Sequence, residues 1–165
     1  MAEIEFASLN DFALHLAEAA IAVVEVEHHA LEKCAQVIEK DAKARIGEYQ
    51  PSTGPFPAWE QLADSTEQEK ARLGYPIDAP LLREGDLRDS IQHEVHGSEA
   101  VVGSQSDIAA YQEFGTDKIP PRPFIGPAAF DSKEKVQKIL GAAIVGGLTV
   151  GQAIHPALGY DFETD

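Results

Sequence analysis

The sequence predicts an α+β fold in one domain: a long N-terminal helix, a small antiparallel β-sheet with a hairpin, and a C-terminal helix packed on that sheet. Three observations predict it. The first 48 residues space their apolar side chains as a helix does, a stretch near residue 91 alternates apolar and polar residues, and helical spacing returns after residue 128. A chain of 165 residues is long enough to bury one core.

The N-terminal helix is expected to extend from Ser8 to Gly47, within a segment of residues 1–48. Ser8 is a suitable N-cap with Asp11 in the first turn, and Gly47 is a suitable stop. A helix of this length is a rod of about 60 Å, which a domain of this size cannot cover on all sides. Part of it is therefore expected to project and pack on a neighbour. Its apolar stripe consists of Phe12, Leu16, Ala20, Val24, His28, Leu31, Ala35, Ile38 and Ala42.

Two segments beside the core are defined by composition. Residues 49–80 are rich in proline and glycine, and we expect a loop there with one short helix at about residues 59–73. Residues 151–165 end in three acidic side chains and are expected to form a frayed acidic tail.

The core is expected within residues 81–150, where a β-hairpin comes first. Gly97-Ser98-Glu99 supplies its turn and separates a first alternating run from the apolar run at residues 100–102. The first run alternates Ile91, His93 and Val95 with Gln92, Glu94 and His96.

Two further elements follow the hairpin. A short extended piece at residues 108–114 is expected to add a strand, and four prolines between residues 120 and 127 then require a non-helical course. The last helix is expected at about residues 128–146.

The charge balance excludes one class of function. Lys and Arg number 13 and Asp and Glu number 28, which gives a formal net charge of −15. A general nucleic-acid binder needs a clustered basic face, and no run of Lys or Arg provides one.

No apolar stretch approaches the roughly 18 to 20 residues that span a bilayer. The N-terminus lacks the basic and apolar regions of a secretory signal, so we expect the chain to stay in the cytoplasm where it is made.

One cluster of titratable residues suggests a metal site. Glu25, His28, His29 and Glu32 crowd one stretch of the long helix, and a carboxylate three residues before an imidazole is the spacing of di-iron bundles. A metal-dependent enzyme using His28 and His29 is therefore one hypothesis. A second set of ligands from another helix is missing, so an exposed, salt-linked helix surface is the preferred interpretation. The single cysteine, Cys34, lies on the apolar stripe and is expected in the core.

The stretch from residue 59 to residue 129 carries motifs in a fixed order. They are Trp59-Glu-Gln-Leu62 and Thr66-x-x-x-Lys70, then Leu82, Gly85, Leu87 and Ser90, then Tyr111, Glu113, Phe114, Gly115 and Thr116, then Pro121, Arg122, Pro123, Phe124, Pro127 and Ala128. In this order they resemble the head-tail joining, or tail completion, proteins of long-tailed double-stranded DNA bacteriophages. The resemblance covers residues 59–146 and leaves the N-terminal helix and the acidic tail outside.

The resemblance implies a structural virion protein and no enzyme or cofactor. Such a protein acts at the neck, where it joins the tail to the DNA-filled head after synthesis in the host cytoplasm. Copies are expected to form a ring, a hexamer in the simplest case, that docks to a head-completion or adaptor protein and to the tail tube or tail terminator protein. DNA would pass through the lumen without specific binding, and no membrane is involved. The alternative within this group is a tail terminator or virion morphogenesis protein of the same fold.

The motif residues themselves have a physical interpretation. Gly115 is expected in a turn that needs positive φ, and Arg122 is held on a stiff backbone between two prolines. We expect Arg122 to act as an exposed charge that pairs with Glu113 or with a carboxylate of a neighbouring subunit. Aromatic side chains are expected to anchor the turn on the sheet. The candidate interface or turn residues are Tyr111, Glu113, Phe114, Gly115, Thr116, Arg122, Pro123 and Phe124.

Overall fold

The structure is a computed structural model that describes residues 8–148, so the acidic tail expected at residues 151–165 lies outside the described residues. Its elements, in chain order, are α1 (Leu9–Arg45), α2 (Asp64–Leu73), α3 (Asp86–Asp89), β1 (Ile91–His96), β2 (Glu99–Ser104), α4 (Asp107–Phe114), α5 (Ile125–Asp131) and α6 (Lys133–Leu148). The α+β class and the antiparallel hairpin that the sequence predicts are confirmed.

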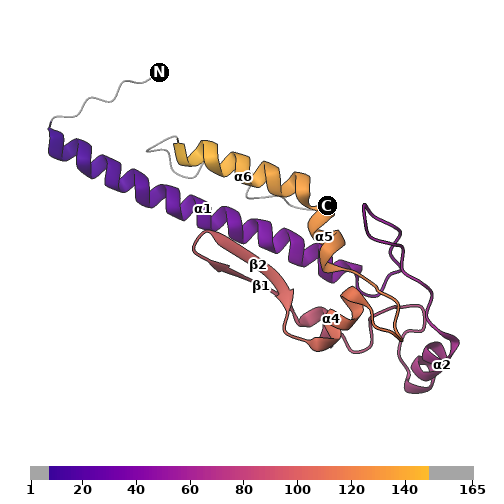
Figure 1. The fold of residues 1–165 in the computed structure, drawn as a ribbon. Coiled ribbons are helices and arrows are strands. Elements are labelled where there is room, and N and C mark those ends of the chain that lie inside the picture. Colours follow the sequence, from indigo (N-terminus) through magenta and orange to yellow (C-terminus); the bar gives the residue numbers. More distant parts are fainter. Residues whose placement is uncertain (1–7, 149–165) are drawn as a thin grey trace.

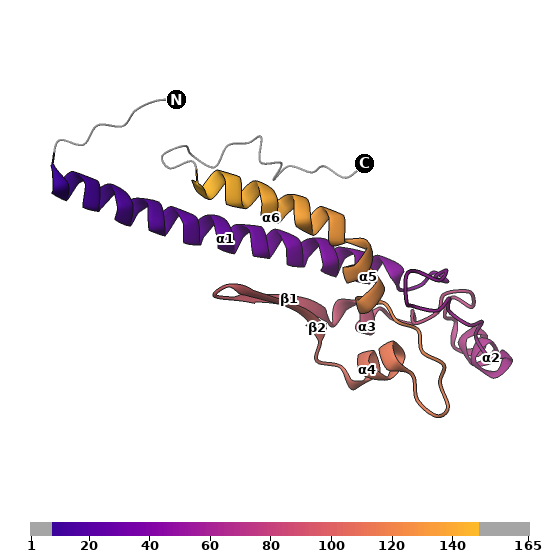
Figure 2. The same cartoon turned by 45° about the horizontal axis from the view of Figure 1, so that its top comes forward.

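Helix α1 is the central element of the fold. Helix α6 lies along one side of it and the β1–β2 hairpin lies along the other, as Figures 1 and 2 show from two directions. Helix α2 lies beyond the C-terminal end of α1, and α4 lies beside that end on the same side as the hairpin (Figures 1 and 2). The molecule is thus a rod with a small folded head at one end.

The ends of α1 follow the sequence signals. Ser8 Oγ accepts a hydrogen bond from the Asp11 amide at 3.1 Å, so the predicted N-cap is confirmed. Lys43 and Arg45 lie in the last turn, where cations interact favourably with the helix dipole. The helix ends before Gly47, whose amide donates to the Pro80 carbonyl at 2.9 Å and fastens the end of α1 to the head.

The hairpin pairs its strands in a register that places one side of each strand on α1. Ile91 pairs with Ser104, His93 with Val102 and Val95 with Ala100, so these residues share one face of the sheet. That face is buried or half-buried, whereas the alternating residues between them on β1 are exposed. A two-stranded sheet has one apolar face to bury, and α1 covers it.

The C-terminal helix differs from the expectation in two ways. It divides at Ser132 into α5 and α6, and it begins at Ile125 instead of residue 128. It also packs on α1 and not on the sheet, because α1 already occupies the one apolar face of the hairpin. Ala143 of α6 is buried with Val26 and Ala30 of α1, and small side chains let the two helices approach closely.

Two other segments also depart from the sequence prediction. Residues 107–114 form helix α4 and not a strand. Asp107 in the first turn and a run of good helix formers explain the helix, since Ile108 is its one β-branched residue. The short helix expected at about residues 59–73 is confined to α2, which starts at Asp64 and ends at Leu73, and Gly74 follows it in the left-handed conformation.

The main core lies in the head, where the C-terminal end of α1 meets the hairpin, α4 and α5. Phe124 and Ile91 are its largest side chains with no exposed surface. Burial of Phe124 confirms the packing expected for it. The other buried members are Ala42, Ile46, Trp59, Ala109 and Ala128.

His93 ties the hairpin to α1. Its Nε2 lies 2.9 Å from Glu32 Oε1 and its Nδ1 is hydrogen-bonded to Glu39. The hydrogen bond with Glu32, followed by that with Glu39, raises the pKa of His93 above its usual value. The bond from His93 also lowers the pKa of Glu32. Burial raises the pKa of Glu39, but hydrogen bonds from Lys43 and His93 outweigh it, so the net shift is downward.

These shifts predict how the stability of the fold depends on pH. The raised pKa of His93 adds stability that is fully present below its unfolded pKa of about 6.5 and is lost as the pH rises through the folded pKa. The lowered pKa values of Glu32 and Glu39 add stability that is lost as the pH falls through them. We predict that the free energy of unfolding of His93→Gln falls less than that of wild type as the pH rises. Urea unfolding between about pH 5.5 and about pH 9 measures this difference.

His96→Gln is the matched control, because His96 also pairs with a glutamate but is 78% exposed at the hairpin tip. It should leave the pH profile of the wild type unchanged. An identical profile for His93→Gln and wild type would show that His93 does not link the hairpin to α1 electrostatically.

Candidate functional site

The candidate residues lie in the second half of α4 and in the segment that leads from it to α5, and Glu113 organises this region. Its Oε2 accepts hydrogen bonds from the amides of Phe124 at 2.8 Å and Ile125 at 3.0 Å, and its Oε1 accepts from the Gly126 amide at 2.8 Å. The Glu113 side chain of α4 thereby accepts hydrogen bonds from the first backbone amides of α5, which have no partner within that helix. Its negative charge also lies at the positive end of the α5 dipole, where it is stabilising. Glu113 is a structural cap.

The approach of Glu113 to α5 requires a residue without a side chain at position 126. A Cβ on Gly126 would lie 2.7 Å from the Phe56 ring and 3.1 Å from Glu113 Oε1. Phe56 in turn packs edge-on against Phe130 of α5, with ring centroids 6.4 Å apart. The proline-rich loop is thus attached to α5 at the point that Glu113 caps.

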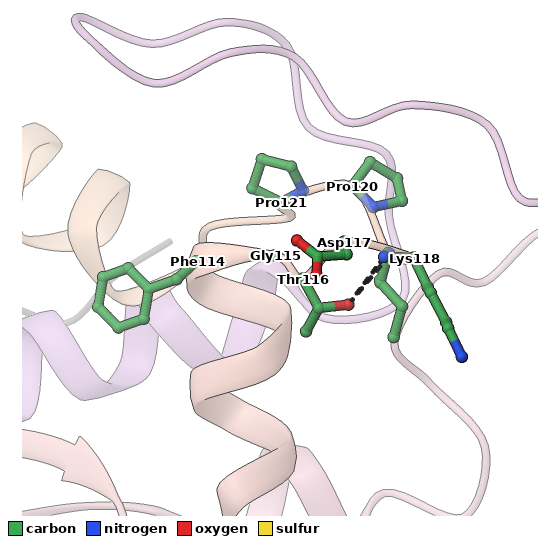
Figure 3. A pocket seen from close by; sticks show the side chains of 8 residues that line it. Phe114, Gly115, Thr116, Asp117, Lys118, Pro120 and Pro121 are labelled. Carbon is green, nitrogen blue, oxygen red and sulfur yellow. Dashed lines mark hydrogen bonds between the residues drawn. The ribbon is translucent and has the colours of Figure 1, made fainter.

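The turn after α4 is closed by Gly115 and Thr116. Gly115 has φ +74°, as the sequence predicts, and a Cβ there would lie 2.9 Å from both the Ile119 carbonyl oxygen and the Pro121 nitrogen. The Thr116 amide donates to the Ile119 carbonyl at 2.9 Å, and Thr116 Oγ1 accepts from the Lys118 amide at 3.2 Å, the bond drawn in Figure 3. These contacts fix the backbone that follows Phe114.

Arg122 is an internal residue, and the prediction of an exposed pairing charge is wrong. It is 6% exposed, and its guanidinium donates to the carbonyl oxygens of Glu60 at 3.0 Å and Gln61 at 3.2 Å. Glu113 is already bonded to α5, so it offers Arg122 no partner. The indole of Trp59 donates to the Pro123 carbonyl at 2.9 Å. Arg122 and Pro123 therefore hold the Trp59 segment onto the turn.

Three large apolar side chains of α4 remain outside the core. Phe114 is 81% exposed, Tyr111 52% and Ile108 57%. The expectation that Tyr111 and Phe114 anchor the turn on the sheet is wrong, because helix α4 buries Ala109 and directs these three residues outward. We call Ile108, Tyr111 and Phe114 the α4 stripe, since residues three apart share a side of a helix. Figure 3 shows the Phe114 ring projecting away from the turn.

Two hollows adjoin the α4 stripe. Residues 114–121 surround a shallow one of about 560 Å³ (Figure 3). A larger cleft of about 730 Å³ lies between α4 and the segments around α2 and α3. Lys70, which lines this cleft, is buried and donates to the Ala79 carbonyl, and burial lowers the pKa of its ammonium group. Lys70 and Arg122 are thus both engaged by backbone carbonyls and support the walls of the cleft.

The metal-site hypothesis finds no support within residues 8–148. No group of three or more His, Cys, Asp or Glu side chains in this part of the chain is arranged to hold a metal ion. His28 and His29 are exposed on α1, and Glu32 is hydrogen-bonded to His93 instead. Cys34 is buried as expected, and burial raises the pKa of its thiol.

Comparison with known proteins decides the family. The chain matches the model of the phage virion morphogenesis family over residues 9–144. It belongs to this family. No curated protein and no solved structure matches it. Within residues 8–148, no helix of this phage virion morphogenesis protein is long and apolar enough to cross a membrane.

The extent of the match corrects the narrower resemblance in the sequence. It begins at the first residue of α1 and ends within α6, so the long helix is part of the family pattern and not an addition to it. The match therefore shows a phage virion-assembly family.

The structure predicts that Arg122→Ala destabilises the virion morphogenesis protein. Removal of the buried guanidinium breaks its charged hydrogen bonds to the carbonyls of Glu60 and Gln61, at a cost of about 1.5–3 kcal/mol. Phe124→Ala should cost about 3–5 kcal/mol because the ring is fully buried. Urea unfolding measures both. If Arg122→Ala is as stable as wild type, Arg122 is not required for the fold and is again a candidate interface charge.

Glu113→Ala is predicted to cost about 2 kcal/mol, because three amides at the start of α5 lose a charged acceptor. Glu113→Gln should lose less, since one acceptor oxygen remains. Glu99→Ala on the exposed edge of the hairpin is the matched control and should stay within about 0.5 kcal/mol of wild type. Equal stability of Glu113→Ala and Glu99→Ala would contradict the capping role.

Proposed function

We propose that this protein is a non-enzymatic structural component of the virion neck that joins the tail to the DNA-filled head as a closed ring. Its family supports a role in virion assembly. The observation that supports docking is the α4 stripe, in which large apolar side chains are exposed together on a fixed helix. Exposed apolar patches of this kind mark contact sites with other proteins, and aromatic residues are enriched at the centre of such contacts.

The setting of the α4 stripe suits docking. The Glu113 cap, the Gly115 turn and the buried Phe124 hold α4 against the core, so little conformational entropy is lost when Phe114 is covered. The stripe also adjoins the larger cleft, which Ile108 lines. A partner surface can therefore contact the stripe and enter the cleft together.

The proposed partners are a head-completion or adaptor protein on one face of the ring and the tail tube or tail terminator protein on the other. One heterologous interface repeated around an axis closes a ring, for which we take six copies as the working number. The formal charge of −15 suits a lumen through which DNA slides without specific binding.

Electron microscopy of particles assembled without this protein tests the neck assignment. If the protein joins heads to tails, particles assembled without it should be full heads and separate tails of normal length. The family name also fits a tail terminator or another morphogenesis role, and tails of uncontrolled length or defective heads would assign the protein there and overturn the neck proposal.

Substitution within the α4 stripe tests the docking surface. We predict that Phe114→Ala abolishes most head-tail joining in an in vitro assembly assay while its melting temperature stays close to that of wild type, because an 81% exposed ring contributes little to stability. Val101→Ala, at an exposed apolar position on β2, is the matched control and should join heads and tails normally. Full joining activity in both Phe114→Ala and Tyr111→Ala would remove the α4 stripe from the interface.

A further inference from the structure

The larger cleft, of about 730 Å³, is lined by two residues that each carry a buried polar atom without a partner. Arg122 Nε and Gln112 Oε1 form no hydrogen bond within residues 8–148. Arg122 is 6% exposed, and its Nη2 is the atom that donates to the Glu60 and Gln61 carbonyls. A buried donor and a buried acceptor left unpaired are costly, and native structures contain few of them.

The charge of this cleft differs from that of the whole chain. The chain has a formal charge of −15, yet four side chains around the cleft are basic and three are acidic. The acidic ones, Glu60, Glu84 and Asp86, are exposed, so solvent and salt screen them. The basic ones are Lys70, Arg83, Lys118 and Arg122.

Three of these four cations lack a carboxylate partner. Within the described part of the chain, Arg83 is the one that forms an ion pair, with Glu69 at 3.5 Å. Lys70 and Arg122 are 2% and 6% exposed, and backbone carbonyls hold both. A carbonyl accepts a hydrogen bond but does not neutralise a charge. The walls of the cleft therefore keep buried positive charge without a counter-ion, which is an unfavourable arrangement until one is supplied.

The backbone of the cleft is also strained at one point. Leu81, which lines the cleft, has φ 63° and is the one non-glycine residue with positive φ among residues 8–148. Its neighbours fix it there, because the Ala79 carbonyl accepts from both Lys70 and the Leu82 amide. Strain of this kind persists where the surroundings over-determine the backbone, and it is common at ligand sites.

We infer that the cleft is a binding site for an acidic segment of a partner protein. A carboxylate in the cleft supplies the missing counter-ion and an acceptor for Arg122 Nε, and a peptide N–H supplies a donor for Gln112 Oε1. An Asp or Glu residue of an extended segment carries both groups. Side-chain rotamers commonly change when an interface forms, so neither atom has to be exposed before binding.

Arg122 remains an internal residue in this arrangement. Its Nη2 holds the segment of Glu60 and Gln61 as before, and its charge acts on the cleft from the wall instead of from the surface. One side chain thus serves the fold and the proposed ligand through different atoms.

The position of the cleft favours a protein over a small anion as the source of the carboxylate. Ile108 belongs both to the cleft and to the α4 stripe, so exposed apolar side chains continue from the rim of the cleft. Such a surface suits a protein partner. The inference rests on the proposed function for docking at the α4 stripe and deepens it by naming the chemistry of the segment that enters beside the stripe.

Two synthetic peptides test the chemistry on the full-length protein. One is a blocked tetrapeptide with two glutamates, and the other has glutamines in their place. An NMR titration follows the side-chain N–H signals of Arg122 and Gln112. We expect the acidic peptide to shift both signals to saturation and to bind at least about tenfold more tightly than the neutral one, with a smaller difference at high salt.

Charge reversal at Lys118 tests the place of binding. Lys118 lines the cleft and is exposed, and Lys135→Glu at an exposed position of α6 makes the same change in net charge as the matched control. We expect Lys118→Glu to weaken binding of the acidic peptide at least about tenfold and Lys135→Glu to leave it nearly unchanged. Both variants should keep the melting temperature of wild type, because exposed charges contribute little to stability.

Gln112→Leu tests the unpaired acceptor. It removes an atom that forms no hydrogen bond, so the melting temperature should not fall, and peptide binding should still weaken because the peptide N–H loses its acceptor. Gln92→Leu, at an exposed position of β1, is the matched control and should bind the peptide as wild type does.

Failure of the inference and failure of the neck proposal give different results. No binding of either peptide, equal binding of both, or equal weakening by Lys118→Glu and Lys135→Glu would overturn the cleft inference and leave the neck proposal standing. Selective binding of the acidic peptide that Lys118→Glu removes, together with normal head-tail joining by particles that lack the protein, would support the cleft inference and defeat the neck proposal.

Discussion

The packing of the hairpin, α5 and α6 on α1 is the constraint on which the structure depends. A two-stranded hairpin and helices of seven to sixteen residues cannot bury their own apolar faces. Helix α1 provides two sides for them: α6 uses small residues around Ala30 and Ala143, and the hairpin is fixed by Ile91 and by the His93 bonds to two glutamates.

The residues that make the sequence recognisable serve the fold first. Glu113 caps α5, Gly115 closes a turn, Arg122 and Trp59 bind the proline-rich segment to that turn, and Phe124 fills the core. These positions need one particular residue type because a buried amide, carbonyl or cavity specifies it. Phe114 and Tyr111 are instead exposed to partners, and the residues around them within the chain do not require a particular residue type at these two positions.

Local signals predicted the parts of the fold that local interactions determine. The Ser8 cap, the stop near Gly47, the Gly97 turn and the positive φ of Gly115 each follow from the chemistry of a few adjacent residues, and the structure confirms them. The assignment of residues 108–114 to a strand failed because a short apolar run carries no period long enough to distinguish strand from helix. The place of α6 on α1, the burial of Arg122 and the bond of His93 to Glu32 and Glu39 join residues far apart in the chain. No spacing in the sequence encodes those contacts, and Arg122 in particular reads as a surface charge until the carbonyls of Glu60 and Gln61 are placed beside it.

Electron cryo-microscopy of the neck of the assembled phage tests the central claim most directly, because it shows both the place of this protein and the cover on the α4 stripe. The account predicts a closed ring of this chain between head and tail, with Phe114 covered by an adjoining protein. A mature neck without this chain, or a ring in which Phe114 faces solvent, would contradict it.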